Sequence, residues 1–302
     1  MKKRLGSVIT LVVSALLLTS CTFDGNFGSE HYSPAKDAVA AAGLDAKVSA
    51  GKMNSGNEFV TLDFDEMTGD ELVRAVTVLI TLPLPAEADR RVNWKSEDKL
   101  APSHLMFSTS QPNMDRVTKF AQAWDVVREN AVLAHYSIPD GIGRFQPEMH
   151  FTLKDSISKE DFKATVNGIK IITEQPSQKT VTGTVVTDPA GLLFGVDAGN
   201  VGISAIRSQD ETDKAVDLLF EMDEIAQQRM SAYPNVASYG IGLNNHSKET
   251  GSSSADFSIY FDSEIPSDTK PSDSDRFYKE SNDFNDEIQL IFHTKADTIG
   301  YW

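Results

Sequence analysis

Two stretches, Thr68-Gly69-Asp70-Glu71 and Ser158-Lys159-Glu160-Asp161, carry the same pattern of a hydroxyl residue followed three positions later by an acid. In such a capping box the hydroxyl oxygen accepts a backbone N–H of the first helical turn, and the acid reaches back to the cap. Apolar residues follow both stretches at helical spacing: Leu72, Val73, Val76, Leu79 and Ile80 after the first, and Phe162, Val166, Ile169 and Ile172 after the second. The pattern predicts two helices at equivalent places of two repeated segments.

Around the first cap, alternating apolar residues and helical stripes predict a series of elements. They are a strand at Phe59–Asp65, the capped helix, a strand at Leu105–Ser110, a helix that begins at Pro112 and buries Trp124, and a strand at Ala131–Ile138.

Around the second cap, the same reasoning predicts a similar series. It comprises strands at Met149–Leu153, Thr180–Thr187, Leu192–Val196, Val201–Ile206 and Val236–Leu243, with a long helix capped by Ser208-Gln209-Asp210-Glu211 that buries Leu219. Asp188-Pro189-Ala190-Gly191 is a turn sequence between two of these strands.

The two series match at a spacing of about 90 to 104 residues, which indicates a duplication. The order strand–helix–strand–strand–helix–strand is that of the ferredoxin-like split βαβ arrangement. We therefore predict an α+β fold of two tandem ferredoxin-like (βαββαβ) units, residues 34–140 and 148–244, followed by a C-terminal half-unit at 256–302.

The C-terminal part reads as a loop at Asn244–Ala255, a strand at Phe257–Phe261, a short helix at Phe277–Phe284 and a strand at Glu287–Thr294. Two arrangements are open for it. It either forms a third, split unit with residues 44–50 and a helix capped by Ser33 with Pro34 at its first position, or it adds strands to an edge.

The N-terminus carries the basic residues Lys2, Lys3 and Arg4, an apolar run at Leu5–Leu18 and then Leu18-Thr19-Ser20-Cys21. A basic start and a short apolar run are typical of a secretory signal. The last four residues resemble the lipobox of bacterial lipoproteins. The resemblance implies that residues 1–20 are removed and that Cys21 is acylated. Residues 21–33 then form a tether at the extracytoplasmic face of the cell membrane, because two acyl chains anchor a protein stably.

Composition narrows the possible partners. The net charge is −16, and removal of Lys2, Lys3 and Arg4 lowers it to −19. Such an acidic surface repels nucleic acid and suits an envelope protein or a cationic partner. Cys21 is the only cysteine, so we expect neither a disulfide nor a thiol-based metal site.

No pattern of catalytic residues emerges. There is no Gly-x-Ser-x-Gly elbow, and the Ser252-Ser253-Ser254 run is interpreted as a linker. The six histidines include no pair at the spacing of a metalloprotease helix; they are His31, His104, His135, His150, His246 and His293. The glycine-rich Gly195–Gly202 is interpreted as a hairpin turn. We predict no catalytic residue, metal or cofactor, although the acidic loop at residues 262–275 leaves calcium open.

Two functions fit these observations. The first is a non-enzymatic binding or interaction module of the cell envelope, anchored through Cys21, with sheet edges and a groove for a partner. The second is an envelope hydrolase with a carboxylate or metal site between the two repeats.

Overall fold

The computed structural model describes residues 29–52, 56–85, 88–97, 101–108, 111–138, 148–174, 177–181, 184–188, 193–204, 209–247, 253–263 and 274–299. The fold is α+β, as the sequence predicts. Its sheet is mixed, with parallel and antiparallel strand pairs, whereas ferredoxin-like units would have antiparallel sheets. The described residues form two compact units. The N-terminal unit holds residues 29–153 and 168–194, and the C-terminal unit holds residues 154–167 and 195–299.

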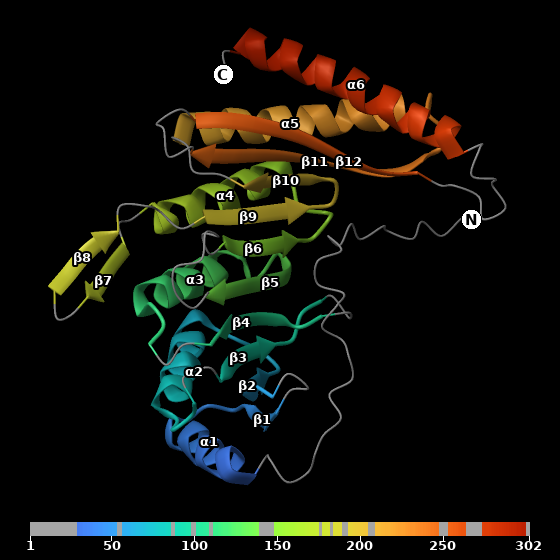
Figure 1. Cartoon of the computed structure of the whole chain (residues 1–302). Helices are drawn as coiled ribbons and strands as arrows, with labels where there is room; N and C mark the ends of the chain where they lie inside the picture. Colours follow the sequence, from blue (N-terminus) through green and yellow to red (C-terminus); the bar gives the residue numbers. More distant parts are fainter. Residues whose placement is uncertain are drawn as a thin grey trace. The chain divides into compact units, whose positions relative to one another are not determined.

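The N-terminal unit alternates antiparallel strand pairs with helices (Figure 1). Its strands lie in the order β1-β2-β3-β4-β5-β6. The pairs β1/β2, β3/β4 and β5/β6 are antiparallel, whereas β2/β3 and β4/β5 are parallel and are joined through a helix. The elements are α1 (Ser29–Ala41), β1 (Lys47–Lys52), β2 (Glu58–Phe64), α2 (Gly69–Thr81), β3 (Asp89–Trp94), β4 (Ser103–Phe107), α3 (Met114–Val127), β5 (Ala131–Ile138) and β6 (Glu148–Leu153).

The predicted ferredoxin-like order is wrong for this unit. A split βαβ arrangement places another strand between the two that the helix joins, but β2 pairs directly with β3. The prediction failed because it lacked β3, in which Arg90 occupies one of the buried positions and obscures the apolar alternation.

The observed period is an antiparallel strand pair followed by a helix, and it is about half of the predicted one. Thr68, Asn113 and Ser158 each accept a backbone N–H of the following helix and lie 45 residues apart. The helices after them are α2, α3, α4 (Lys159–Thr173) and, 50 residues further on, α5 (Gln209–Met230). The predicted match of Thr68 with Ser158 therefore spans two periods.

The buried residues of the helices recur with the same spacing of 45 to 50 residues. Four positions, each 45, 45 and 50 residues apart, are buried in all four helices. They are Leu72, Ala75, Val76 and Leu79 in α2; Val117, Phe120, Ala121 and Trp124 in α3; Phe162, Thr165, Val166 and Ile169 in α4; and Thr212, Ala215, Val216 and Leu219 in α5. Trp124 and Leu219 occupy equivalent buried positions, as the sequence predicts.

In the C-terminal unit, β9 (Leu193–Ala198) and β10 (Val201–Ser204) pair antiparallel through a turn at Gly199, which has a positive φ of 56°. The interpretation of Gly195–Gly202 as a hairpin is confirmed. Strand β11 (Val236–Ser247) lies parallel to β10 and antiparallel to β12 (Ser253–Ser263).

The N-terminal unit also carries a separate hairpin of β7 (Ser177–Val181) and β8 (Thr184–Asp188), where the sequence predicted one strand.

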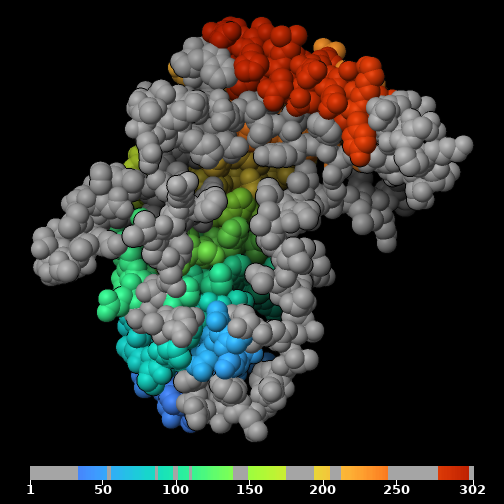
Figure 2. Space-filling view, viewed as in Figure 1, coloured from blue at the N-terminus to red at the C-terminus, as the bar shows by residue number. Residues whose placement is uncertain are grey.

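The C-terminal part differs from the prediction in two ways. The described residues of the predicted loop at 244–255 belong to strands, because β11 and β12 pair up to Ser247 and Ser253. The predicted short helix and strand are one helix, α6 (Ser274–Ile299), whose surface runs along the outside of its unit (Figure 2). Helix α6 buries residues at helical spacing: Ser281, Phe284, Ile288, Phe292 and Ala296.

Of the two arrangements left open for the C-terminal part, the addition of a strand is confirmed for β12, whereas the predicted strand at Glu287–Thr294 belongs to α6. Strand β1 pairs with β2 in the N-terminal unit, and β12 pairs with β11 in the C-terminal unit. Helix α1 begins at Ser29, so Pro34 lies inside the helix and not at its first position.

The N-terminal sheet has two unlike faces. Helices α1, α2 and α3 lie along the same side of the strands (Figure 1). The side chains facing them are buried and include Leu62, Val92, Trp94, Leu105, Phe107, Tyr136 and Phe151. The opposite face, called here the outer face, carries the alternate residues, most of which are half-exposed: Ser49, Phe59, Asp63, Arg91, Asn93, His104, Met106, His135, His150 and Thr152.

Candidate functional site

Most of the sequence-predicted site residues lie outside the described part of the chain. This holds for Cys21 and for residues 264–273 of the acidic loop. The ends of that loop, residues 262–263 and 274–275, belong to β12 and α6. Ser253 and Ser254 lie in β12, so the interpretation of this serine run as a linker is wrong there.

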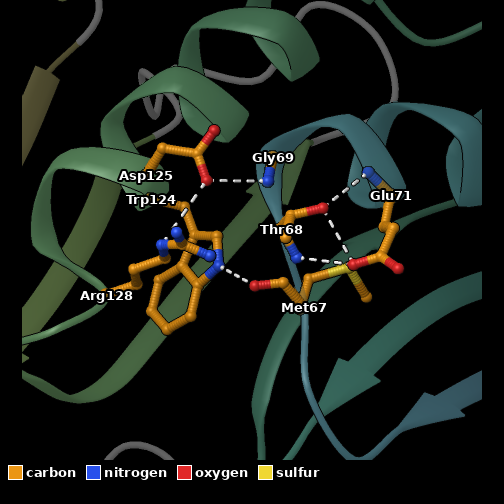
Figure 3. A network of polar contacts seen from close by, with 7 residues as sticks. All are labelled: Met67, Thr68, Gly69, Glu71, Trp124, Asp125 and Arg128. Carbon is orange, nitrogen blue, oxygen red and sulfur yellow. Dashed lines mark hydrogen bonds and ion pairs between the residues drawn. The ribbon is translucent and has the colours of Figure 1, made fainter.

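The densest polar network of the N-terminal unit joins the start of α2 to α3 (Figure 3). The Trp124 indole N–H donates to the Met67 carbonyl oxygen at 2.9 Å, and the Gly69 N–H donates to Asp125 Oδ1 at 2.9 Å. Thr68 and Glu71 complete the predicted capping box. The network satisfies N–H groups that a helix start leaves without intrahelical partners, so its role is to lock two neighbouring repeats together.

A buried cation is the second polar feature of this unit. The Arg90 side chain is fully buried, and its guanidinium donates to the carbonyl oxygens of Ala88 at 2.7 Å and Pro85 at 3.2 Å. A buried charge is costly unless it is paired or hydrogen-bonded. These contacts hold the segment that leads from α2 into β3.

In the C-terminal unit, Asp223 of α5 accepts three hydrogen bonds. They come from Tyr239 at 2.6 Å, Asn200 at 3.2 Å and Gln227 at 2.8 Å. Burial, followed by the hydrogen bond to the Asp223 carboxylate, raises the pKa of the Tyr239 hydroxyl. The contacts fix α5 against β11 and the β9–β10 turn.

Helices α4 and α5 are joined by a second set of polar contacts within the C-terminal unit. Asp217 lies 2.9 Å from Lys163 Nζ and 3.3 Å from Lys159 Nζ. Burial raises the pKa of the Asp217 carboxyl, but the hydrogen bonds and charges of the two lysines outweigh it, and the net pKa lies below the ordinary value. Like Asp223, this carboxylate serves helix packing.

The outer face of the N-terminal sheet carries a line of polar residues across all six strands, called here the polar row. Strand register places its members opposite one another in turn. From β1 to β6 they are Lys47, Asp63, Asn93, His104, His135 and His150. The Asn93 amide donates to Asp63 Oδ1 at 2.9 Å. The polar row thus gathers chemically versatile side chains from strands that are far apart in sequence.

The last three members, His104, His135 and His150, are called here the histidine row. The ring centroids of His104 and His135 are 5.8 Å apart and those of His135 and His150 are 5.0 Å apart, with interplanar angles of 20° and 25°. Burial has the largest effect on His104 and lowers its pKa. A backbone hydrogen bond to Pro102 raises this pKa and the charge of Arg91 lowers it, so that the net pKa lies below the ordinary value.

The parallel stacking of the three rings bears on whether the histidine row could bind a metal ion. Stacked rings direct their nitrogens side by side and not toward a common point. Among the described residues, accordingly, no group of three or more His, Cys, Asp or Glu side chains is arranged to hold a metal ion. Each imidazole ring carries two nitrogens that donate or accept hydrogen bonds, so the row is a hydrogen-bonding surface.

Part of this surface could be inferred from the predicted strands. His135 and His150 fall in predicted strands, and His104 falls one residue before a predicted strand. Their neighbourhood depends on two different pairings, a parallel one between β4 and β5 and an antiparallel one between β5 and β6. Spacing in the sequence does not reveal such pairings.

Comparison with known protein families, with curated proteins and with solved structures finds no match to this chain. Among the helices that the structure describes, none has a stretch long and apolar enough to cross a membrane.

Proposed function

We propose that the chain is an extracytoplasmic lipoprotein, held at the cell membrane through acylated Cys21, and that it acts as a non-enzymatic binding or interaction module. The N-terminal residues that resemble a lipobox support the anchor. The roles of the polar networks support the binding function, since those around Trp124, Asp217 and Asp223 join elements of the fold.

The observation that carries the proposal is the unequal burial of the two faces of the N-terminal sheet. One face packs on helices, while the outer face keeps most side chains half-exposed. Apolar Phe59, Met106 and Leu133 lie there among the polar row. A mixture of apolar and polar side chains is the usual composition of surfaces that bind a partner reversibly.

The partner that fits best is another protein of the envelope with a basic docking surface. The net charge of −16, or −19 without the first 20 residues, favours association with a cationic surface and speeds the encounter. The structural period of strand pair plus helix also supports an origin of the chain by tandem duplication, with the 45-residue segment as its unit.

Capture from detergent-solubilised membranes tests the proposal. The bait is the chain from Thr22 onward. It is compared with a variant that carries Met106→Glu on the outer face and with a matched variant that carries Gln122→Glu at an exposed position of α3. We expect a partner that the bait and the α3 variant retain and that the outer-face variant loses. Equal retention by all three proteins contradicts the use of the outer face.

A further inference from the structure

We propose that the exposed side of α6 is a docking surface for a basic amphipathic helix of a partner protein, which covers Leu290 and places cations beside Asp286 and Asp297. Leu290 is 69% exposed, more than any other large apolar side chain that the structure describes. The inference uses the C-terminal unit alone. It therefore goes beyond the proposed binding through the outer face and does not depend on it.

Helix α6 belongs to the repeated series of helices. Three of the four positions that are buried in each of α2, α3, α4 and α5 recur in α6, 69 residues after their counterparts in α5. They are Ser281, Phe284 and Ile288, and all three are buried. Helix α6 therefore packs on its sheet with the same side as the preceding helices.

The position of Leu290 contacts a following helix elsewhere in the series. Its counterpart in α5 is Glu221, which pairs with Lys295 of α6. Its counterpart in α3 is Val126, whose Cγ1 atom would lie 2.9 Å from a Cβ at Gly168 of α4. Leu290 is apolar and more exposed than Val126, which is 43% exposed. A further helix therefore fits along this flank of α6.

The charges beside Leu290 decide which kind of helix fits. Asp286 lies four residues before Leu290 and Asp297 seven residues after it, and residues at these spacings share one face of a helix. Both carboxylates are exposed, and neither forms an ion pair with another residue that the structure describes. They repel an acidic partner helix, including α6 of a second copy, and attract lysine or arginine.

The other charged side chains of α6 leave this negative charge in place. Its described ion pairs are Lys279 with Asp283, Lys295 with Glu221, and Glu287 with Arg229 of α5. Both lysines are thereby engaged, and the half-exposed Glu280 is a further acid. His293 lies one turn after Leu290, and its ring contacts that of Phe292 edge-on. The flank around Leu290 is therefore apolar at its centre and acidic on both sides.

The spacing of these groups specifies the partner helix. With a rise of 1.5 Å per residue, the two carboxylates lie about 6 Å and about 10 Å from Leu290 along the helix axis, in opposite directions. A complementary helix carries an apolar residue opposite Leu290, a basic residue one turn away on one side and a basic residue two turns away on the other. Exposed ion pairs contribute little, so the leucine contact supplies most of the affinity.

Binding of synthetic helical peptides to the chain from Thr22 onward, measured by fluorescence anisotropy, tests the inference. The basic peptide consists of alanine and glutamine with one central leucine, a lysine four residues before it and a lysine seven residues after it. A second basic peptide has the reversed order, for antiparallel docking. The acidic peptides carry glutamate in place of lysine. We expect one basic peptide to bind, with an affinity that falls as salt is added, and the acidic peptides not to bind.

Variants of the protein show whether the peptide binds at α6. Leu290→Ser should weaken binding about tenfold, because the burial of a leucine is lost. The double variant Asp286→Asn and Asp297→Asn should weaken it about two- to fivefold and remove most of the salt dependence. The matched variant Ile171→Ser changes the counterpart of Leu290 in α4, which is 58% exposed, and should leave binding unchanged.

Three results overturn the inference. They are the absence of binding by both basic peptides, equal affinity for basic and acidic peptides, and an effect of Leu290→Ser no larger than that of Ile171→Ser.

Discussion

Replacement of Trp124 by alanine is the strongest test of how the repeats are packed. The indole ring is 7% exposed, lies 5.2 Å from the Trp94 ring and donates its N–H to the Met67 carbonyl. Removing it leaves a cavity between α2 and α3 and an acceptor without its donor. We expect a loss of about 3–5 kcal/mol in the free energy of unfolding.

Two further variants divide this loss into its parts. Trp124→Phe keeps most of the ring but removes the donor to Met67, and should cost about 1–3 kcal/mol. Ser158→Ala removes only the helix cap that accepts the Asp161 N–H at 3.0 Å, and should cost about 1 kcal/mol.

Urea denaturation of the chain from Thr22 onward, followed by circular dichroism, measures all three variants. We expect the largest loss for Trp124→Ala and smaller losses for the other two substitutions. The packing described for α2 and α3 is refuted if Trp124→Ala costs no more than Ser158→Ala, because the ring would then not fill a buried position.

Three other predictions concern the anchor, the redox state and the start of α2. Cys21→Ser should release the protein from the membrane fraction or leave an unprocessed precursor, and normal processing with full retention contradicts the anchor. Reductant should not shift the melting temperature of the chain from Thr22 onward, which contains no cysteine; a shift of several degrees means that its stability has another source. Gly69→Ala should destabilise more than Gly168→Ala, because its new Cβ would lie 2.3 Å from Asp125 Oδ2 and 2.6 Å from a backbone oxygen, whereas at Gly168 it meets a side-chain methyl at 2.9 Å. Equal melting temperatures for the two glycine variants contradict this account.

Helices were predictable where caps and apolar stripes agree. Thr68 and Ser158 mark helix starts through local hydrogen bonds, which depend on few residues. The prediction for residues 287–294 failed because their apolar residues fit both the period of a strand and the period of a helix. Ile288, Leu290 and Phe292 alternate as in a strand, yet Ile288 and Phe292 also fall at helical spacing, and Leu290 is 69% exposed. Tertiary packing decides between such periods, and a local pattern does not.

The polar row was beyond prediction for a different reason. It depends on the register of five strand pairings, and a slip of one residue moves a side chain to the other face of the sheet. His104, His135 and His150 are 31 and 15 residues apart in sequence. Only the pairing of β4 with β5 and of β5 with β6 makes them neighbours. Their stacking therefore could not be predicted from the sequence without knowledge of these pairings.

Photo-crosslinking in intact cells tests whether the outer face binds another envelope protein. A photoreactive residue replaces Met106 on the outer face in one variant and the exposed Gln122 of α3 in the other. Both variants keep Cys21 and its anchor. We expect a covalent adduct with another envelope protein from position 106 and none from position 122. Adducts from position 122 alone, or none from position 106 while the protein stays anchored, would contradict a binding module that works through its outer face.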